Sequence, residues 1–427
     1  MSQCVQVQFP LPVLYTFSSV FDIIFIKGKI ILLFKYFLRA YQCFRKVLRR
    51  FSKNIGERFE ILFQEGYERL KYRKIETKRI WKSVKLTKEQ KREIDEFFKQ
   101  NYGKRIPYTY HRLYTAYTGN FDKKYIPNML YAPYLERFLT DLSYGNVFTN
   151  KNTLSILARG LNVKMPENIV MCNKNGYYDK YFNRITLSEV ERLLQDAGKV
   201  FIKKTTESFG GRGCTIANFL NGIDINTNLP VSKLVCSLGD NFCIQELIVC
   251  HESIRKIYPH SVNTFRVITY ILEGEVYHCP VILRLGLGGS FTDNASAGGI
   301  FIAVDEDGVL HKSAFTEYRK EFTSHPDTNL VFEGHKIEHL NKVIELAERL
   351  QLAIPQVGII NWDFTINEEG HPILVEANMR NDVQVGSVWL PQMAHGKGPF
   401  GDNTAKILQY IRQGKKKSYS KRRDFTM

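Results

Sequence analysis

The sequence predicts an α+β protein with more than one domain. Two pairs of apolar segments, 262–270 with 281–284 and 357–363 with 372–378, each flank a Glu-Gly turn and therefore predict antiparallel hairpins. Apolar residues recur at helical spacing between 337 and 350, which predicts an amphipathic helix in the same core. A chain of 427 residues suggests about three domains.

Positive charge is concentrated at the two ends of the chain. The formal net charge is +17; residues 1–82 hold 17 Lys and Arg against 6 Asp and Glu, and residues 412–427 hold 7 against 1. The region 83–411 is therefore neutral overall, and the charge concerns association rather than fold. The eight cysteines show no metal-finger spacing, so we expect small buried thiols rather than a disulfide framework.

Residues 1–82 predict a basic helical segment rich in apolar and aromatic residues. The first basic residue is Lys27, which argues against a cleaved secretory signal. Charges interrupt the apolar run from Leu11 to Phe51, so no window offers the roughly 20 uncharged residues of a spanning helix. Two interpretations stay open: a helix lying on an anionic membrane surface, or a helix packed on the protein's own body. We expect no specific nucleic acid as a partner, because no recognised binding module accompanies the charge.

Residues 83–148 predict a leading helical lobe. Thr87 and Gln90 form a capping box that opens a helix through Phe97 and Phe98. The tyrosine-rich stretch 108–144 is expected to pack on the main body. A further helix is predicted over 152–159, with Gly160 as its C-cap.

A short strand that ends in lysine is followed by a glycine-rich loop. The strand is Val200 to Lys203, and the loop contains Gly210, Gly211 and Gly213. Glycines let backbone N–H groups approach phosphate oxygens, and Lys203 adds a positive charge. The loop matches neither the P-loop nor the dinucleotide-binding fingerprint, and its alternative is an ordinary hairpin turn.

Two arginines lie among the apolar residues of the first hairpin. A buried arginine is costly unless it pairs with an anion, so Arg266 and Arg284 indicate either an anion site or surface salt bridges. A strict two-residue turn at 273–274 would place them on opposite faces of the sheet. We therefore expect a bulge or a strand end to re-aim one of them.

The second hairpin brings together three oxygen-bearing side chains. If Glu369 and Gly370 are the central turn residues, Asp363 lies directly opposite Glu376, with Cβ atoms roughly 4.5–5.5 Å apart. Asn378 returns to the same face two residues later. Such a cluster should repel itself without a cation, and hard oxygen ligands suit Mg²⁺ held together with phosphates. The alternative is a polar hairpin that faces solvent.

The order of these segments resembles the ATP-grasp superfamily and, more narrowly, the sugar-transfer-associated ATP-grasp family. The resemblance covers roughly 104–410 and rests on SVNTFRVITY, LRLGLGG with DNASAGG, HPDT, and NWDF with VEAN. It implies an ATP-grasp fold: two α+β lobes clamping ATP, with a helical N-terminal extension. The small lobe would span 149–252 and the C-terminal lobe 253–411, followed by a basic disordered tail at 412–427.

The resemblance also implies roles for individual residues. Asn150 stands where the family commonly has Asp, and Lys204 stands where proline is usual. Glutathione synthetases and ribosomal-protein glutamate ligases have a similar succession of arginines, asparagine and glycines. The implied cofactor-binding residues are Lys151, Lys203, Gly210, Gly211 and Gly213 at the phosphates, Gln245, Glu246, Leu247 and Ile248 at adenine, and Glu252 at ribose. The implied catalytic residues are Arg266, Arg284 and Asn294, and the implied ligands of Mg²⁺ (or Mn²⁺) are Asp363, Glu376 and Asn378.

The implied activity is ATP-dependent ligation of a carboxylate to an amine through an acyl-phosphate, in cell-surface polysaccharide biosynthesis. Small carboxylate and amine substrates, sugar- or lipid-linked, would be the partners besides ATP. The location would be cytoplasmic, with peripheral attachment at the inner membrane face. Two alternatives stay open: a phosphotransferase with a hydroxyl acceptor, and a membrane-associated scaffold without catalysis. His325-Pro326 and Arg380 receive no role.

Overall fold

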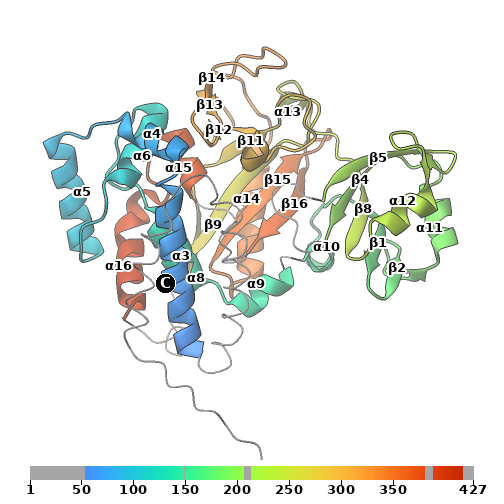
Figure 1. The fold of residues 1–427 in the computed structure, drawn as a ribbon, viewed down its shortest axis with the longest axis horizontal. Coiled ribbons are helices and arrows are strands. Elements are labelled where there is room, and N and C mark those ends of the chain that lie inside the picture. Colours follow the sequence, from blue (N-terminus) through green and yellow to red (C-terminus); the bar gives the residue numbers. More distant parts are fainter. Residues whose placement is uncertain (1–52, 149, 206–212, 380–387, 417–427) are drawn as a thin grey trace, which may run out of the picture.

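The computed structural model describes residues 53–148, 150–205, 213–379 and 388–416, and Figure 1 shows two antiparallel sheets with helices around them. The apolar N-terminal run Leu11 to Phe51, Gly210, Gly211 and Arg380 lie outside the described residues. Each sheet has eight strands, in the orders β3-β2-β1-β8-β4-β5-β6-β7 and β14-β13-β12-β11-β9-β15-β16, with β10 paired to β9. The predicted α+β class is confirmed.

The first sheet belongs to the part of the chain drawn in green at the right of Figure 1. Two amphipathic helices, α11 (Leu187–Leu194) and α12 (Val231–Ser237), share a core with its strands. A capping box of Thr186 and Glu189 opens α11. The strands are β1 (Asn168–Asn173), β2 (Gly176–Tyr178), β3 (Arg184–Ile185), β4 (Gly198–Lys204), β5 (Thr215–Leu220), β6 (Ile223–Asp224), β7 (Leu229–Pro230) and β8 (Phe242–Glu246).

The second sheet carries both predicted hairpins at its centre. Its strand β9 alternates between two cores: Phe265 and Val267 pack with α14 (Leu340–Ala353), whereas Ile268 and Tyr270 pack with the leading helices. This alternation follows from the period of two along a strand. The strands are β9 (Thr264–Leu272), β10 (Glu275–His278), β11 (Ile282–Leu285), β12 (Ile300–Val304), β13 (Leu310–Phe315), β14 (Glu321–Phe322), β15 (Ile359–Ile366) and β16 (Pro372–Asn378).

Helices from both ends of the chain cover the face of the second sheet that bears Ile268 and Tyr270, at the left of Figure 1. Ile61, Tyr72 and Ile80 share one core with Ile94 and Tyr114, so the described part of the N-terminal segment packs on the protein's own body. The helices are α3 (Lys53–Lys71), α4 (Ile75–Lys82), α5 (Lys88–Asn101), α6 (Thr109–Thr118), α7 (Asn128–Leu130), the π-helix η1 (Tyr131–Glu136), α8 (Arg137–Leu139), α15 (Trp389–His395), the 3-10 helix η3 (Gly401–Asn403) and α16 (Thr404–Gly414). The helix α9 (Leu142–Phe148) differs, because its Phe148 packs against the core that contains α14.

The remaining short helices lie near the junction of the sheets. They are α10 (Lys151–Gly160), α13 (Glu252–Arg255) and the 3-10 helix η2 (Ala295–Ala297). Asn150 caps α10 by accepting from the backbone N–H groups of Asn152 and Thr153. The helix includes Gly160, so the predicted C-cap is one residue early; the left-handed residue is Asn162, with φ of 54°. Within the described residues, no helix has the length and apolar character needed to cross a membrane.

Candidate active site

An irregularity between β10 and β11 places the two arginines on one face. β10 pairs with β9 in the register His278 to Thr269, but β11 pairs in the register Ile282 to Arg266, a shift of one residue. Arg284 therefore lies opposite Thr264, two residues from Arg266, and both guanidinium groups emerge on the same side. The predicted irregularity, which brings one arginine to the same face as the other, is confirmed. It lies in the segment 279–281 between β10 and β11.

The second hairpin has the predicted register where Asp363 pairs with Glu376, but its turn differs from the predicted one. Asp363 pairs with Glu376, as expected, and Asn361 pairs with Asn378. The turn, however, is a three-residue loop in which Gly370 takes φ of 75° and the Asn367 amide donates to the His371 carbonyl. A bulge at Val375 restores the register, because Phe364 already pairs with Leu374. The two departures from a simple hairpin cancel, so the expected residues still face each other.

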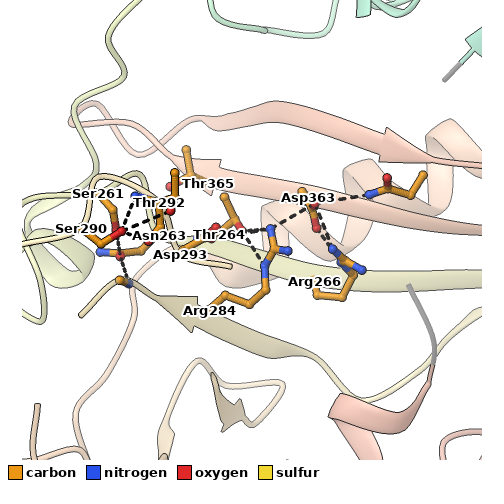
Figure 2. A network of polar contacts seen from close by, with 12 residues as sticks. Ser261, Asn263, Thr264, Arg266, Arg284, Ser290, Thr292, Asp293, Asp363 and Thr365 are labelled. Atoms are coloured by element: carbon orange, nitrogen blue, oxygen red, sulfur yellow. Dashed lines mark hydrogen bonds and ion pairs between the residues drawn. The ribbon is translucent and has the colours of Figure 1, made fainter. Parts of the chain in front are cut away.

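Asp363 is the shared partner of both arginines (Figure 2). Arg266 donates from Nε to Oδ1 at 2.6 Å and from a terminal nitrogen to Oδ2 at 3.1 Å. Arg284 also reaches Oδ2 at 3.1 Å, and the Asn378 amide approaches the same oxygen at 3.4 Å. All three charged groups are buried. Buried arginines are tolerated here because each donates charge-assisted hydrogen bonds to a carboxylate.

Thr264 and Asp293 complete the surroundings of Arg284, as Figure 2 shows. Arg284 donates from Nε to the Thr264 hydroxyl at 3.0 Å, and that hydroxyl donates in turn to Asp293. Asp293 lies 3.6 Å from the guanidinium. Burial alone would lower the pKa of Arg284, but Asp293, Asp363 and Glu376 together raise it. Burial raises the pKa of Asp293, and Arg284 opposes this shift.

Two lysines from different elements meet at Glu376. Lys151, the first residue of α10, places Nζ 3.2 Å from Glu376 Oε1. Lys203 on β4 is 4% exposed, and burial lowers its pKa, with the positive charge of Lys151 adding to the shift and Glu376 opposing it. A buried lysine in this state favours an anionic neighbour, because an anion restores the charged form.

Most of these side chains line one cavity of about 390 Å³ between the two sheets, whereas Arg266 and Asn378 are not part of its described lining. Its described lining includes five Lys or Arg, namely Lys151, Lys199, Lys203, Arg255 and Arg284, and four Asp or Glu, namely Glu246, Asp293, Asp363 and Glu376. Leu247, Ile248 and Asn294 also line it, together with apolar Phe201 and Phe291. A cavity that combines apolar walls with a slight excess of positive charge suits a ligand that has a flat ring and an anionic tail.

Some predicted site residues have other surroundings. Gln245 lines the cavity, but its amide donates to Asn168 Oδ1 at 2.7 Å within the sheet. Glu252 is not brought to the cavity: it begins α13, where its carboxylate is exposed and binds Lys256 at 2.7 Å. Gly213, with φ of 74°, lies beside the Lys204 side chain rather than in the described cavity lining.

The charge balance of the oxygen cluster differs from the sequence prediction. We expected Asp363, Glu376 and Asn378 to repel one another without a metal. Instead, Arg266 and Arg284 neutralise Asp363, and Lys151 neutralises Glu376. The donor set still fits Mg²⁺, because two carboxylates and an amide converge on one sheet face. A cation would enter this neutralised cluster readily only together with an anion.

His325, which had no predicted role, supports the glycine-rich segment 286–299. It is fully buried, donates from Nε2 to the Gly286 carbonyl at 3.0 Å and stacks on Tyr258, which lines the cavity. A Cβ atom at Gly286 would lie 2.5 Å from the Tyr258 ring, so only glycine permits this close approach. Sequence reasoning also missed Thr264 and Asp293, for which no pattern stood out.

The comparison with solved structures finds distant similarity. D-alanyl-alanine synthetase A from Vibrio cholerae O1 biovar eltor shares 13% identity over 62% of this chain and 64% of its own, with a TM-score of 0.37. D-cycloserine synthetase DcsG shares 13% identity over 65% and 73%, with a TM-score of 0.38. N5-carboxyaminoimidazole synthase from Aspergillus clavatus shares 13% over 59% and 51%, with a TM-score of 0.33. The chain thus covers about half to three quarters of these proteins. A comparison with curated proteins finds no match.

The comparison with protein families gives a match over most of the chain. The model of the family described as sugar-transfer associated ATP-grasp matches residues 132–407. The matched range contains α10, both sheets and every side chain of the Asp363 network described above. On the strength of this match and the two-sheet architecture, the chain belongs to the sugar-transfer associated ATP-grasp family.

Proposed function

We propose that this protein is an ATP-dependent ligase that joins a carboxylate to an amine. The observation that carries the proposal is the convergence of Lys151, Lys203, Arg284, Asp363 and Glu376 on one cavity between the two sheets. Membership in an ATP-grasp family supports ATP as the nucleotide. The carboxylate would attack the γ-phosphate, giving an acyl-phosphate and ADP. The amine would then attack the acyl carbon, and phosphate would leave.

The nucleotide would lie along β8 and the segment that follows it. Backbone groups of Glu246, Leu247 and Ile248 would hold adenine, with the Gln245 amide kept in place by Asn168. Lys151 and Lys203 would hold the phosphates, joined by the loop containing Gly210, Gly211 and Gly213. Glycine N–H groups and lysines are suited to this because both donate to phosphate oxygens at close range.

Asp363, Glu376 and Asn378 would hold Mg²⁺, with Mn²⁺ as a substitute. The bound ion would offset the negative charge of the phosphates during transfer. Since Asp363 and Glu376 already bind cationic side chains, we propose that metal and nucleotide bind together and that the phosphates draw Lys151 away from Glu376.

Arg284 and Asn294, which line the cavity, would act on the group being transferred, and Arg266 would support them from outside the cavity lining. Arg284 lines the cavity, and its guanidinium is fixed from two sides by Asp363 and Asp293. A donor fixed before the reaction stabilises developing charge without reorganising, which is the main source of catalysis in phosphoryl transfer. Arg266 does not line the cavity and would act by holding Asp363.

The substrates would come from cell-surface polysaccharide synthesis, such as capsule, O-antigen or exopolysaccharide. The family description associates these ATP-grasp proteins with sugar transfer, which supports a sugar acid or an amino sugar as one substrate. Leu11 to Phe51, with the basic residues Arg45, Lys46, Arg49, Arg50 and Lys53, would attach the protein to the cytoplasmic face of an anionic membrane.

A hydroxylamine trap tests the ligase chemistry. The full chain is incubated with ATP, Mg²⁺, hydroxylamine and a panel of sugar acids and amino acids. An acyl-phosphate reacts with hydroxylamine to give a hydroxamate, so one hydroxamate per ADP is expected with the correct acid. ADP formed without hydroxamate, together with phosphate attached to a hydroxyl, would instead identify a phosphotransferase. No ATP consumption with any acid in the panel would favour the scaffold.

A further inference from the structure

Outside the described lining of the cavity, a buried histidine nitrogen has no hydrogen-bond partner within the part of the chain that the structure describes. His395 ends α15, is 7% exposed, and donates from Nε2 to the Val281 carbonyl at 2.7 Å. Its Nδ1 is buried and makes no hydrogen bond to any of the described residues. Because the proton sits on Nε2, Nδ1 presents a lone pair. Burying an acceptor without a partner costs free energy, so a ligand bound at this atom would stabilise the fold.

Two further ligand-type side chains lie beside the His395 ring. Asp305 follows β12, and His311 lies on β13; their Oδ1 and Nε2 atoms are 2.8 Å apart. The rings of His311 and His395 meet edge to face with centroids 5.0 Å apart. One ligand atom from each of the three residues lies within 4.8 Å of the others. The hairpin and the helix thus bring two imidazoles and a carboxylate together from distant parts of the sequence.

We propose that Asp305, His311 and His395 form a binding site for a divalent transition-metal ion such as Zn²⁺, distinct from the cavity that binds ATP. Two imidazoles and one carboxylate, with a fourth position left for water, are a donor set that Zn²⁺ commonly uses. A metal-bound imidazole usually donates its other ring N–H to an acceptor that fixes its tautomer and orientation. For His395 this acceptor would be the Val281 carbonyl.

The tautomer of His395 and the exposure of the other two side chains are compatible with metal binding. The Val281 carbonyl accepts the proton on His395 Nε2, so Nδ1 of that imidazole can bind a metal ion. The 4.8 Å spread is wider than the roughly 3.4 Å that separates ligands at about 2.1 Å from one ion. Asp305 and His311 would close the difference, because their side chains are 57% and 33% exposed.

The ion would add a link between α15 and the β12–β13 hairpin, which already pack against each other. α15 lies against β12 and β13 in Figure 1, and the ion would tie its last residue to the hairpin of these two strands. Both histidines also line a groove of about 920 Å³ between the leading helices and β13, from which the water ligand would come.

Competition with a chromophoric chelator tests the site. The full chain, without a polyhistidine tag, is stripped of metal and titrated with Zn²⁺ in excess Mg²⁺ and without nucleotide. One Zn²⁺ per chain is expected. His311→Ala and Asp305→Asn should each weaken binding at least about 100-fold, since even supporting residues contribute 10- to 100-fold. These two positions carry the test because their partial exposure allows substitution without loss of the fold.

Two control variants fix the location. His371→Ala removes a histidine that is half exposed at the tip of the β15–β16 hairpin and should leave the affinity unchanged. Glu376→Gln alters the ATP cavity and should also leave the Zn²⁺ stoichiometry at one, which separates this proposal from the proposed function. The proposal is overturned if the wild type binds no Zn²⁺, which would leave Nδ1 to a water molecule, or if His311→Ala and Asp305→Asn bind as the wild type does.

Discussion

Replacing Asp363 by asparagine should destabilise the protein more than any other single change in the cavity. The substitution keeps the shape of the side chain but removes the charge that binds Arg266 at 2.6 and 3.1 Å and Arg284 at 3.1 Å. Both arginines are less than a tenth exposed. Removing one partner of a buried ion pair costs about 3–5 kcal/mol, and Arg284 keeps Asp293 as a second partner. We therefore expect the free energy of unfolding to fall by about 3–5 kcal/mol.

The matched variant is Glu376→Gln, which removes the other carboxylate of the cluster. Glu376 is 29% exposed and forms an ion pair with Lys151 at 3.2 Å, so its loss should cost about 1 kcal/mol or less. Both variants should lose Mg²⁺-dependent ATP turnover by at least about 100-fold, because each removes a proposed metal ligand. The two substitutions thus share an effect on activity and differ in their effect on stability.

Urea unfolding of the full chain, followed by circular dichroism, measures the difference. If Asp363→Asn unfolds within about 1 kcal/mol of the wild type, the carboxylate is not the shared counter-ion of the two arginines. Turnover at the wild-type rate by Glu376→Gln would remove the metal assignment. Loss of stability in both variants to the same extent would mean that the difference in burial does not govern the cost.

Four further outcomes are expected. Lys203→Met should weaken MgATP binding about 10- to 100-fold. Lys204→Met should change the affinity less than about 3-fold, because Lys204 donates to the Leu238 and Asp240 carbonyls instead. Equal losses of affinity in calorimetry would contradict the assignment of Lys203 to the face of β4 that meets the cavity. Because the pKa of Lys203 is lowered, Lys203 should take up a proton when phosphate binds at alkaline pH. The enthalpy of binding should then depend on the buffer, and Lys203→Arg should abolish that dependence. A binding enthalpy that is the same in every buffer would refute this. Burial lowers the pKa of His111 from 6.5 to about 4, so the unfolded state binds the proton at a higher pH than the folded state does. The free energy of unfolding should therefore fall by up to about 3 kcal/mol as the pH drops from 6.5 to about 4. If His111→Gln loses stability between these pH values as the wild type does, His111 is not the cause. The full chain should sediment with anionic liposomes at low salt and a chain starting at Lys53 should not; binding by the shorter chain would place the attachment elsewhere.

The truncation in the last experiment follows from the structure rather than from the charge pattern. The sequence suggested a boundary near Ser83, where the excess of basic residues ends. However, α3, α4 and the turn between them bury Ile61, Ile80 and Tyr72 in the core of the leading helices. Removing them would expose that core, so only the residues before Lys53 are suitable for deletion.

The hairpins were predictable because turn residues and strand periodicity fix which side chains face one another. The pairing of Asp363 with Glu376 followed from counting residues on either side of the turn, and it is confirmed. The count succeeded although the turn has three residues, because the bulge at Val375 compensates. A bulge leaves no reliable mark in a single sequence, so its position could not be predicted. The same holds for the shift that aligns Arg266 with Arg284.

Partners contributed by loops were not predictable. Asp293 lies in a glycine-rich segment with no period, and only the folded chain buries it against Arg284 and Thr264. Glu252 was expected near ribose, but α13 starts at that residue and directs its carboxylate to Lys256. The charge balance was missed for a related reason: spacing within one hairpin cannot show that Lys151, more than 200 residues upstream, pairs with Glu376.

Calorimetric titration of the full chain with a non-hydrolysable ATP analogue, with and without Mg²⁺, tests the central claim most directly. The claim is that the cavity between the two sheets binds nucleotide and metal together. We predict one analogue per chain, at least about 10-fold tighter binding with Mg²⁺ than without it, and loss of this Mg²⁺ effect in Glu376→Gln. Binding that is equally tight without Mg²⁺, or a Mg²⁺ effect that persists in Glu376→Gln, would contradict the assignment of the site.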